Sequence, residues 1–348
     1  MKKALLTGIT GQDGSYLAEF LLAKGYEVHG IVRRTSIEDA AHKLSNLKEI
    51  LNKIVLHTAS LDNHLSLYKV INQVQPDECY HLAASSFVSY SFDDEFSILS
   101  SNFSGTHYLL ASIKEIMPVC RFYFAGSSEM FGSASNSPQN ELTPFNPRSI
   151  YGISKLSSHH LVRNYREQYD LFACTGILYN HESPRRDFKF VTRKITSSVA
   201  KIKLGLQDKL YLGNLDAVRD WGYAPDYVYS MWLMLQQDTP RDYVVASGIN
   251  HSVREFVKYA FDCVGLNYQE FVEVDQRFYR EAEKIPLCGD SSQIQRELNW
   301  QSNRQLKDII REMIENDLNF FSKENMITIS SPVSRNSYKS GQQIKVKS

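Results

Sequence analysis

Short runs of β-branched and aromatic residues alternate with longer amphipathic stretches through the first half of the chain. The pattern predicts strands at 4–6, 27–32, 53–57, 77–82, 121–125 and 172–178, and helices at 15–24, 38–51, 63–73, 103–116 and 151–169. Strands and helices that alternate at this spacing form right-handed βαβ units, whose strands build a parallel sheet covered by helices on both faces. The first half therefore predicts a doubly wound α/β fold.

The alternation weakens after residue 179. The polar segment 180–186 predicts a loop, and apolar periodicity predicts helices at 191–205, 227–236 and 253–264. We expect a first domain at 1–179 with segments that return to it near 223–248, and a smaller C-terminal α/β domain at 180–222 and 249–322. From 323 to 348 the chain is polar with little apolar pattern, so we expect a mobile tail there.

Composition and charge narrow the range of partners that this protein can have. The 348 residues contain 39 Lys plus Arg and 39 Asp plus Glu, so the net charge is zero, whereas nucleic-acid binders carry a basic surplus. No apolar run approaches the ~20 residues of a membrane-spanning helix. The five cysteines lack the short paired spacing of a disulfide framework or a zinc cluster. We therefore expect no nucleic acid, membrane or metal partner, and reduced thiols in a cytoplasmic protein.

A glycine-rich loop joins the first predicted strand to the first predicted helix. Residues 4–14 read ALLTGITGQDG, which places Gly8, Gly11 and Gly14 between the two elements. In a dinucleotide-binding loop such glycines allow a tight turn, backbone approach to the pyrophosphate, and close helix–sheet packing. The helix N-terminus adds N–H groups and a positive dipole end for the phosphates. At the head of a βαβ series, this loop predicts a Rossmann-type nucleotide-binding domain at 1–179.

Two arginines follow the second predicted strand, where an NAD-specific site usually carries an acidic residue. The guanidinium groups of Arg33 and Arg34 suit the 2′-phosphate of NADP, because they form charge-assisted, forked hydrogen bonds. We therefore expect NADP rather than NAD as the cofactor. The alternative is an ordinary pair of surface arginines.

The first catalytic candidates are Tyr151 and Lys155, at the start of the helix predicted at 151–169. Residues four apart share one helix face, so both side chains can reach the same ligand. A tyrosine has an ordinary pKa of about 10, and a neighbouring lysine together with an oxidised nicotinamide favours the phenolate. Tyr151 can then take a proton from a sugar hydroxyl as a general base.

Two further candidates follow the strand predicted at 121–125, which ends in Gly-Ser-Ser-Glu. Ligands bind at the carboxyl ends of the strands in doubly wound sheets. There Ser127 can hydrogen-bond the same hydroxyl as Tyr151. Glu129 supplies a carboxylate that can remove a carbon-bound proton and later pass a proton to a leaving group. The alternative for Glu129 is a solvated turn residue.

Six segments resemble the extended short-chain dehydrogenase/reductase family, and within it the GDP-mannose 4,6-dehydratases. They are TGITGQDGSYL at 7–17, RFYFAGSSEMFG at 121–132, NPRSIYGISK at 146–155, NHESPRR at 180–186, FVTRKIT at 190–196 and LGNLDAVRDWG at 212–222. The matches follow one another in order across most of residues 1–300. Ser127 stands where these proteins usually have Thr, so the hydroxyl is kept.

The resemblance implies an internal redox cycle on a GDP-sugar, in which Tyr151 deprotonates the C4 hydroxyl while a hydride passes from C4 to NADP. Glu129 then removes the C5 proton, Ser127 and Glu129 assist the loss of water from C6, and the hydride returns to C6. The implied NADP-binding residues are Gly8, Thr10, Gly11, Gln12, Asp13, Gly14, Arg33, Arg34, Leu82, Tyr151 and Lys155. The implied GDP-sugar-binding residues are Asn180, Val191, Lys194, Arg219, Arg280 and Glu283.

Three alternatives stand beside dehydration of GDP-mannose. The substrate can be a GDP-manno-heptose, which carries an extra hydroxymethylene beyond C6. The reaction can be a C4 dehydrogenation, epimerisation or 4-keto reduction on the same scaffold; Glu129 argues against these, because only elimination needs a base for the C5 proton. The chain can also be an idle NADP-binding regulator. The resemblance further implies a homo-oligomer, either a dimer or a tetramer.

Overall fold

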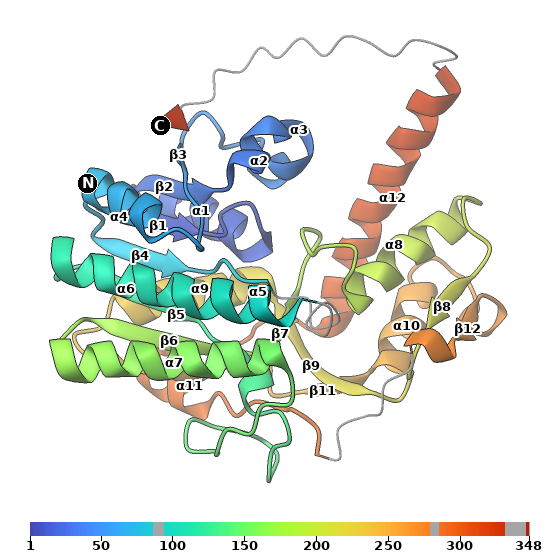
Figure 1. Cartoon of the computed structure of the whole chain (residues 1–348). Coiled ribbons are helices and arrows are strands. Elements are labelled where there is room, and N and C mark those ends of the chain that lie inside the picture. The colour runs from blue at the N-terminus through green and yellow to red at the C-terminus, as the bar shows by residue number, and fades with distance from the viewer. Residues whose placement is uncertain (86–93, 279–284, 331–345, 348) are drawn as a thin grey trace.

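The computed structural model describes residues 1–85, 94–278, 285–330 and 346–347 (Figure 1). Its main sheet is parallel and has eight strands in the order β10-β6-β5-β4-β1-β2-β3-β13. These strands are β1 (Lys3–Thr7), β2 (Glu27–Val32), β3 (Val55–Thr58), β4 (Glu78–His81), β5 (Arg121–Ala125), β6 (Ala173–Leu178), β10 (Tyr243–Val245) and β13 (Val346–Lys347). The order reverses between β1 and β4, which is the switch point of a doubly wound fold. The predicted Rossmann-type fold class is confirmed.

Helices cover both faces of this sheet (Figure 1). One face carries α1 (Gln12–Ala23) and α9 (Ala224–Leu235). The other carries α4 (His64–Val74), α6 (Gly105–Ile116) and α7 (Ile150–Tyr169). Shorter helical segments lie between these elements, namely α5 (Glu95–Leu99), the π-helix η3 (Ser100–Ser104), the 3-10 turn η4 (Ser128–Met130) and α11 (Ser292–Leu298).

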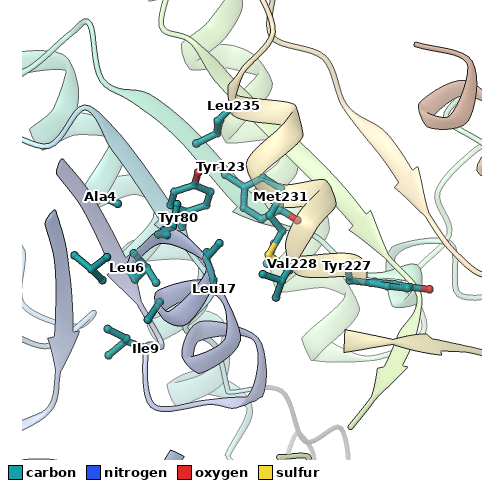
Figure 2. Packing of buried hydrophobic residues seen from close by; sticks show 14 of the residues in the cluster. Ala4, Leu6, Ile9, Leu17, Tyr80, Tyr123, Tyr227, Val228, Met231 and Leu235 are labelled. Atoms are coloured by element: carbon teal, nitrogen blue, oxygen red, sulfur yellow. The ribbon is translucent and has the colours of Figure 1, made fainter. Parts of the chain in front are cut away.

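Side chains alternate along the strands between two buried clusters. Leu5 packs in the cluster beneath α4, α6 and α7, whereas Ala4 and Leu6 pack in the cluster beneath α1 and α9. Tyr80 and Tyr123 share this second cluster with Leu6 (Figure 2). Because successive side chains of a strand point to opposite faces, an uninterrupted apolar run can fill both clusters.

The single helix predicted around 38–51 was wrong. In its place lie α2 (Arg34–Glu38), α3 (Ala40–Lys43) and the 3-10 turn η1 (Ser45–Leu47). The interruption falls at Asp39, whose backbone leaves the helical region at φ −117° and ψ 53°. Its carboxylate accepts a hydrogen bond from Nδ1 of His42 at 2.6 Å. Aspartate is a weak helix former in a helix interior, which fits a break at this position.

Residues after 179 add two small sheets and a third buried cluster. One sheet has the order β11-β9-β7, with strands β7 (Asn180–Glu182), β9 (Val218–Tyr223) and β11 (Asn250–Ser252). The other pairs β8 (Leu210–Leu212) with β12 (Val272–Val274). Around them lie α8 (Val191–Lys203), α10 (Val253–Asp262), α12 (Leu306–Ser330) and the 3-10 turns η5 (Tyr268–Glu270) and η6 (Gln276–Phe278). The cluster draws its apolar side chains from α8, α10 and α12.

The prediction of a loop over 180–186 was wrong for its first three residues, which form β7 and pair in parallel with β9. Because these residues are polar, the apolar pattern gave no sign of a strand. His181 and Glu182 are buried, and each meets a polar partner on another element: Asp13 of α1 for His181, and Thr192 of α8 for Glu182. A buried polar side chain with a partner is compatible with a core strand.

The C-terminal region departs from the predicted mobile tail in two places. α12 continues to Ser330, so residues 323–330 are helical. Extending an existing helix costs little free energy, because only the first turn carries the nucleation penalty. Val346 and Lys347 form β13 at the edge of the main sheet, in parallel with β3. Residues 331–345 and Ser348 lie outside the described part of the chain.

None of the helices in the described part of the chain is both long enough and apolar enough to cross a membrane.

Candidate active site

The glycine loop follows β1 and closes onto the first turn of α1. Gly8 has a φ of +72°, a left-handed conformation, and a Cβ there would lie 2.8 Å from the backbone nitrogen of Ala83. A Cβ on Gly14 would lie 2.2 Å from the carbonyl oxygen of Gly8. The first N–H groups of an α-helix have no partner within the helix, so the N-terminus of α1 can bind an anion. The loop therefore fits a dinucleotide diphosphate.

A cavity of about 1180 Å³ opens at this loop. Its walls come from the loop itself, the carboxyl ends of β2, β3 and β4, the segment 184–190, and α12. Eight of the predicted cofactor residues line it: Gly8, Thr10, Gly11, Gln12, Asp13, Gly14, Arg33 and Leu82. Arg34, Tyr151 and Lys155 do not. Since cavities of ~300–1,000 Å³ hold drug-sized ligands, this one has room for a dinucleotide.

Cationic side chains line the cavity beyond the end of β2. Arg33 is the N-cap residue of α2. Lys43 of α3 and Lys48 after η1 line the same cavity. Sequence analysis missed these two lysines, because nothing in the local pattern places them near Arg33. Arg34 is the first residue of α2, and its side chain is exposed outside the cavity lining.

Tyr151 and Ser127 come together as predicted. A hydrogen bond joins their side chains, and Tyr151 is the second residue of α7, whose N-cap Ser149 accepts a hydrogen bond from the Gly152 nitrogen at 3.0 Å. This cap ends the preceding loop and directs the phenol toward the end of β5. Lys155, one turn further on, is buried, and its Nζ donates to the carbonyl oxygen of Ala125 at 2.7 Å.

Burial governs the proton affinity of both side chains. It raises the pKa of Tyr151 to about 12, against the lowering effects of the Ser127 hydrogen bond and the Arg186 charge. Burial also lowers the pKa of Lys155 to about 7. The protein's own groups therefore leave the phenol protonated at neutral pH, and the expected lowering of its pKa is not supplied by the folded chain alone.

Glu129 belongs to the same cluster. It lies in η4, where its backbone nitrogen donates to Oγ of Ser127 at 3.2 Å. A Cβ on Gly152 would lie 2.6 Å from the carbonyl oxygen of Glu129, so this turn packs directly against the start of α7. The Glu129 charge is close enough to raise the pKa of Tyr151. One carboxylate, one hydroxyl and one phenol thus meet at the carboxyl end of β5.

Asn102 supports this cluster and was missed by sequence analysis. It is buried in the π-helix η3, and its Nδ2 donates to Oγ of Ser154 at 3.0 Å. Its Oδ1 accepts from the backbone nitrogen of Ser85 at 3.0 Å. Ser154 lies between Tyr151 and Lys155 on α7, so these bonds hold the catalytic turn against η3. A single asparagine inside an amphipathic stretch carries no signal that would have identified it.

His181 is a second residue that sequence analysis missed. Its Nε2 lies 2.9 Å from Oδ2 of Asp13, one of the predicted cofactor residues. Because 168 residues separate the two along the chain, no local pattern indicates the pair.

The four predicted GDP-sugar residues that the structure describes lie outside the cavity lining. Asn180 begins β7 and Arg219 lies on the neighbouring strand β9, while Val191 begins α8. Lys194 of α8 places its Nζ 4.0 Å from the centre of the Phe278 ring, and burial lowers its pKa. These four residues thus share the part of the molecule built from β7, β9 and α8. Arg280 and Glu283 lie outside the described residues.

The fold and the glycine loop define a protein of the Rossmann-type class whose loop fits a dinucleotide. RMD from Pseudomonas aeruginosa, solved in complex with NADPH, is similar with a TM-score of 0.78 and 22% identity, covering 92% of this chain and 100% of that chain. A dTDP-glucose 4,6-dehydratase from Bacillus anthracis str. Ames, solved with NAD, is similar with a TM-score of 0.79 and 19% identity, covering 93% and 98%. These likenesses establish the fold.

Sequence comparison identifies the family. The GDP-mannose 4,6 dehydratase family matches residues 5–313. GDP-mannose 4,6 dehydratase 2 of Arabidopsis thaliana is 48% identical over 336 residues, which covers 94% of this chain and 89% of that protein. The chain belongs to the GDP-mannose 4,6-dehydratase family, and the resemblance inferred from its motifs is confirmed.

Proposed function

We propose that this chain removes water from GDP-mannose to form GDP-4-keto-6-deoxymannose. Family membership over 94% of the chain supports this nucleotide-sugar dehydratase activity. The observation that carries the proposal is the cluster of Ser127, Glu129 and Tyr151 at the carboxyl end of β5. Elimination needs one base for the C4 hydroxyl and another for the C5 proton, whereas redox chemistry at C4 needs only the first.

The proton steps can be assigned to these side chains. The positive charge of an oxidised nicotinamide would favour the phenolate form of Tyr151, which then takes the proton of the C4 hydroxyl. Ser127 also hydrogen-bonds this hydroxyl, and C4 becomes a ketone as its hydride passes to the nicotinamide. The ketone acidifies the C5–H bond, so the Glu129 carboxylate removes that proton. Protonated Glu129 then donates to the C6 hydroxyl, which leaves as water while a double bond forms between C5 and C6. In the last step the hydride returns to C6 and C5 takes a proton from solvent, while Tyr151 releases its proton to solvent.

A nicotinamide cofactor fits the glycine loop and the cavity beside it. When bound, it accepts a hydride from C4 of the sugar and returns it to C6. The choice of NADP over NAD rests on Arg33, which lines the cavity together with Lys43 and Lys48. Three cations favour the extra 2′-phosphate of NADP. The diphosphate itself would meet the N-terminus of α1.

Substitution of Arg33 tests the choice of cofactor. Arg33→Ala should weaken NADP binding about tenfold or more and leave NAD binding nearly unchanged, because only NADP carries the 2′-phosphate. Isothermal titration calorimetry with each dinucleotide measures both affinities. Arg34→Ala is the matched control and should have the smaller effect, since Arg34 lies outside the cavity lining. Equal losses of NADP and NAD affinity in Arg33→Ala would contradict the assignment.

The GDP part of the substrate is assigned to Asn180, Val191, Lys194 and Arg219. Lys194 and Arg219 supply positive charge for the diphosphate from two neighbouring elements, α8 and β9. Arg280 and Glu283 belong to the same proposal from the sequence resemblance. The homo-oligomeric state and the cytoplasmic location stay predictions.

Product analysis in deuterated water tests the activity. The purified chain is incubated with NADP and either GDP-mannose or a GDP-manno-heptose, and the products are analysed by mass spectrometry and NMR. Loss of one water with deuterium at C5 of GDP-mannose is the expected result. Faster turnover of the heptose would change the substrate assignment. Oxidation at C4 without loss of water would contradict the dehydratase.

A further inference from the structure

A buried ion pair joins the glycine loop to β7. His181 is only 7% exposed, and its Nδ1 lies 2.7 Å from the carbonyl oxygen of Tyr179. Its Nε2 lies 2.9 Å from Oδ2 of Asp13. A carbonyl oxygen accepts hydrogen bonds and cannot donate, so Nδ1 carries a proton. Nε2 then has to share a second proton with the Asp13 carboxyl group.

Three features keep that second proton on His181. Oδ1 of Asp13 accepts a hydrogen bond from Nε2 of Gln12 at 3.0 Å, which favours the carboxylate. Asp13 lies in the first turn of α1, where the positive end of the helix dipole also favours a negative charge. The Asp13 charge raises the pKa of His181, and the His181 charge lowers the pKa of Asp13, each against the effect of burial. Each of these contacts favours the imidazolium form of His181.

The other elements packed against His181 leave this charge in place. The Tyr227 ring of α9 stacks on the imidazole, with ring centres 4.5 Å apart. Arg186, in the segment after β7, lowers the pKa of His181 but has its own partner in Glu182 at 3.3 Å. Asp13 thus remains the principal counter-charge of His181.

Further hydrogen bonds join α1 to β7 and to the residues that follow β7. Gln12 donates from Nε2 to the carbonyl oxygen of His181 at 3.0 Å, and its Oε1 accepts from Oγ of Ser183 at 2.8 Å. Arg185 donates to Oγ of Ser15 at 3.1 Å and to Glu19 at 2.7 Å. These hydrogen bonds hold the N-terminal part of α1 against β7 and the residues that follow it.

The charge of Asp13 affects ligand binding, because Asp13 lies where a dinucleotide would bind. It lines the cavity at the N-terminus of α1, where the diphosphate of a dinucleotide would bind, and an uncompensated carboxylate there would repel it. The Asp13 charge also raises the pKa values of Tyr151 and Lys155. A neutral ion pair avoids the repulsion, while Asp13 keeps its ability to accept hydrogen bonds.

We propose that His181 is a positioning residue whose imidazolium neutralises Asp13, so that the glycine loop accepts an anionic dinucleotide and stays joined to the strand that carries Asn180. The inference rests on the proposed use of a nicotinamide dinucleotide, and it does not depend on which sugar is the substrate. His181 acts through Asp13 and not by contact with reacting atoms.

Charge-balanced variants test the proposal. His181→Gln keeps a donor for Asp13 but removes the charge, so the NADP dissociation constant should rise about tenfold. The double variant Asp13→Asn/His181→Gln restores neutrality, so it should bind NADP more tightly than His181→Gln alone. A purely structural role for His181 predicts the opposite order, because the second change removes a further native contact. His160→Gln, on the exposed side of α7, is the matched control and should bind NADP like the original chain.

Two readouts keep this test separate from the dehydratase assay. Calorimetry measures NADP binding without any sugar, so it remains informative if the chain proves to catalyse another reaction. Imidazole ¹⁵N shifts of the full chain report the protonation of His181, which should persist at pH 7 and be lost in Asp13→Asn. If His181→Gln does not fold, Asp13→Asn identifies the resonance instead. A neutral His181 at pH 7, or a double variant that binds NADP no better than His181→Gln, would overturn the proposal.

Discussion

At the candidate site, Lys155 lies in an environment that is unusual for a lysine, because the residue is buried. Lys155 is 3% exposed, and its Nζ donates to the carbonyl oxygen of Ala125. Burial lowers the pKa of Lys155 and raises that of the partly buried Tyr151. Burial disfavours the charged form of each group, so the pair is held in its neutral form more than either side chain would be in water.

The shift of Lys155 predicts a pH-dependent stability. Between about pH 7 and 10.5 the unfolded chain holds a proton on this lysine that the folded chain has released, so its contribution to the free energy of unfolding rises with pH. Lys155→Met removes this contribution. The variant should gain stability relative to the original chain at pH 7, and the gain should shrink toward pH 10 by up to about 1.4 kcal/mol per pH unit. Urea denaturation at pH 7, 8 and 9 measures the trend.

Lys53→Met, at an exposed position, is the control for that series. Its stability difference from the original chain should stay constant over the same pH range. A Lys155→Met difference that is equally flat would show that Lys155 is charged in the folded protein.

Substitution of Glu129 should separate oxidation at C4 from the loss of water. Glu129→Gln keeps the size of the side chain but cannot remove the C5 proton, so loss of water should fall by at least 100-fold. Hydride transfer from C4 depends on Tyr151 and should continue in part. Single-turnover absorbance of reduced nicotinamide at 340 nm, together with product mass, separates the two steps. Unchanged dehydration would remove Glu129 from the mechanism.

At the scale of the element, the start of α7 is placed by its neighbours. Ser149 caps the helix, Asn102 of η3 binds Ser154, and η4 packs against Gly152. The periodicity of this twenty-residue segment predicts a helix, but these contacts set where its first turn lies. Tyr151 is one residue from the Gly152 contact, so the packing of one backbone on another sets the distance between phenol and carboxylate.

Gly152→Ala tests that packing. Its Cβ would lie 2.6 Å from the Glu129 carbonyl oxygen, so η4 and α7 have to move apart. We expect kcat to fall about tenfold or more and the free energy of unfolding to fall by roughly 1–3 kcal/mol, although alanine is the better helix former. NADP affinity should change little. Ile153→Ala, at an exposed neighbouring position, is the control, and equal kcat values for the two variants would contradict the prediction.

At the scale of the whole molecule, the cavity is shared between distant parts of the chain. Its lining includes the glycine loop at residues 7–14, the segment 184–190, and Asn316 and Phe320 of α12. A buried ion pair at 2.6 Å joins Arg193 of α8 to Asp317 of α12, and Arg193 also donates to the carbonyl oxygen of Pro184. A ligand in this cavity therefore contacts elements of the main sheet and elements packed on the third buried cluster at once.

Ligand binding should accordingly stabilise the whole molecule. A ligand at one hundred times its dissociation constant adds about 2.7 kcal/mol to the free energy of unfolding. At equal concentrations, NADP should raise the melting temperature more than NAD does if, as proposed, its 2′-phosphate binds beside Arg33, Lys43 and Lys48, which line the cavity. Calorimetric melting with each dinucleotide measures the difference. An equal or larger shift with NAD would contradict the choice of NADP.

Much of the fold and part of the site could be predicted from the sequence by itself. Six of the eight strands of the main sheet, the glycine loop and the Tyr151–Lys155 spacing depend on residues that are close together in the chain, where the backbone repeats of strand and helix set the pattern. The strands β10 and β13 were not predicted. The division into domains stays a prediction, and so do the roles of the binding residues. The helix expected around 38–51 failed at Asp39, whose backbone leaves the helical region despite the apolar periodicity.

Only the tertiary structure decided which distant polar residues meet. The Asp13–His181 pair spans 168 residues, and the Asn102–Ser154 bond spans 52. Before folding, each of these side chains is an ordinary polar residue in water, and β7 reads as a loop for that reason. Burial removes the water and leaves each polar group dependent on its partner, so the contact acquires its strength and its chemistry only when the chain has folded.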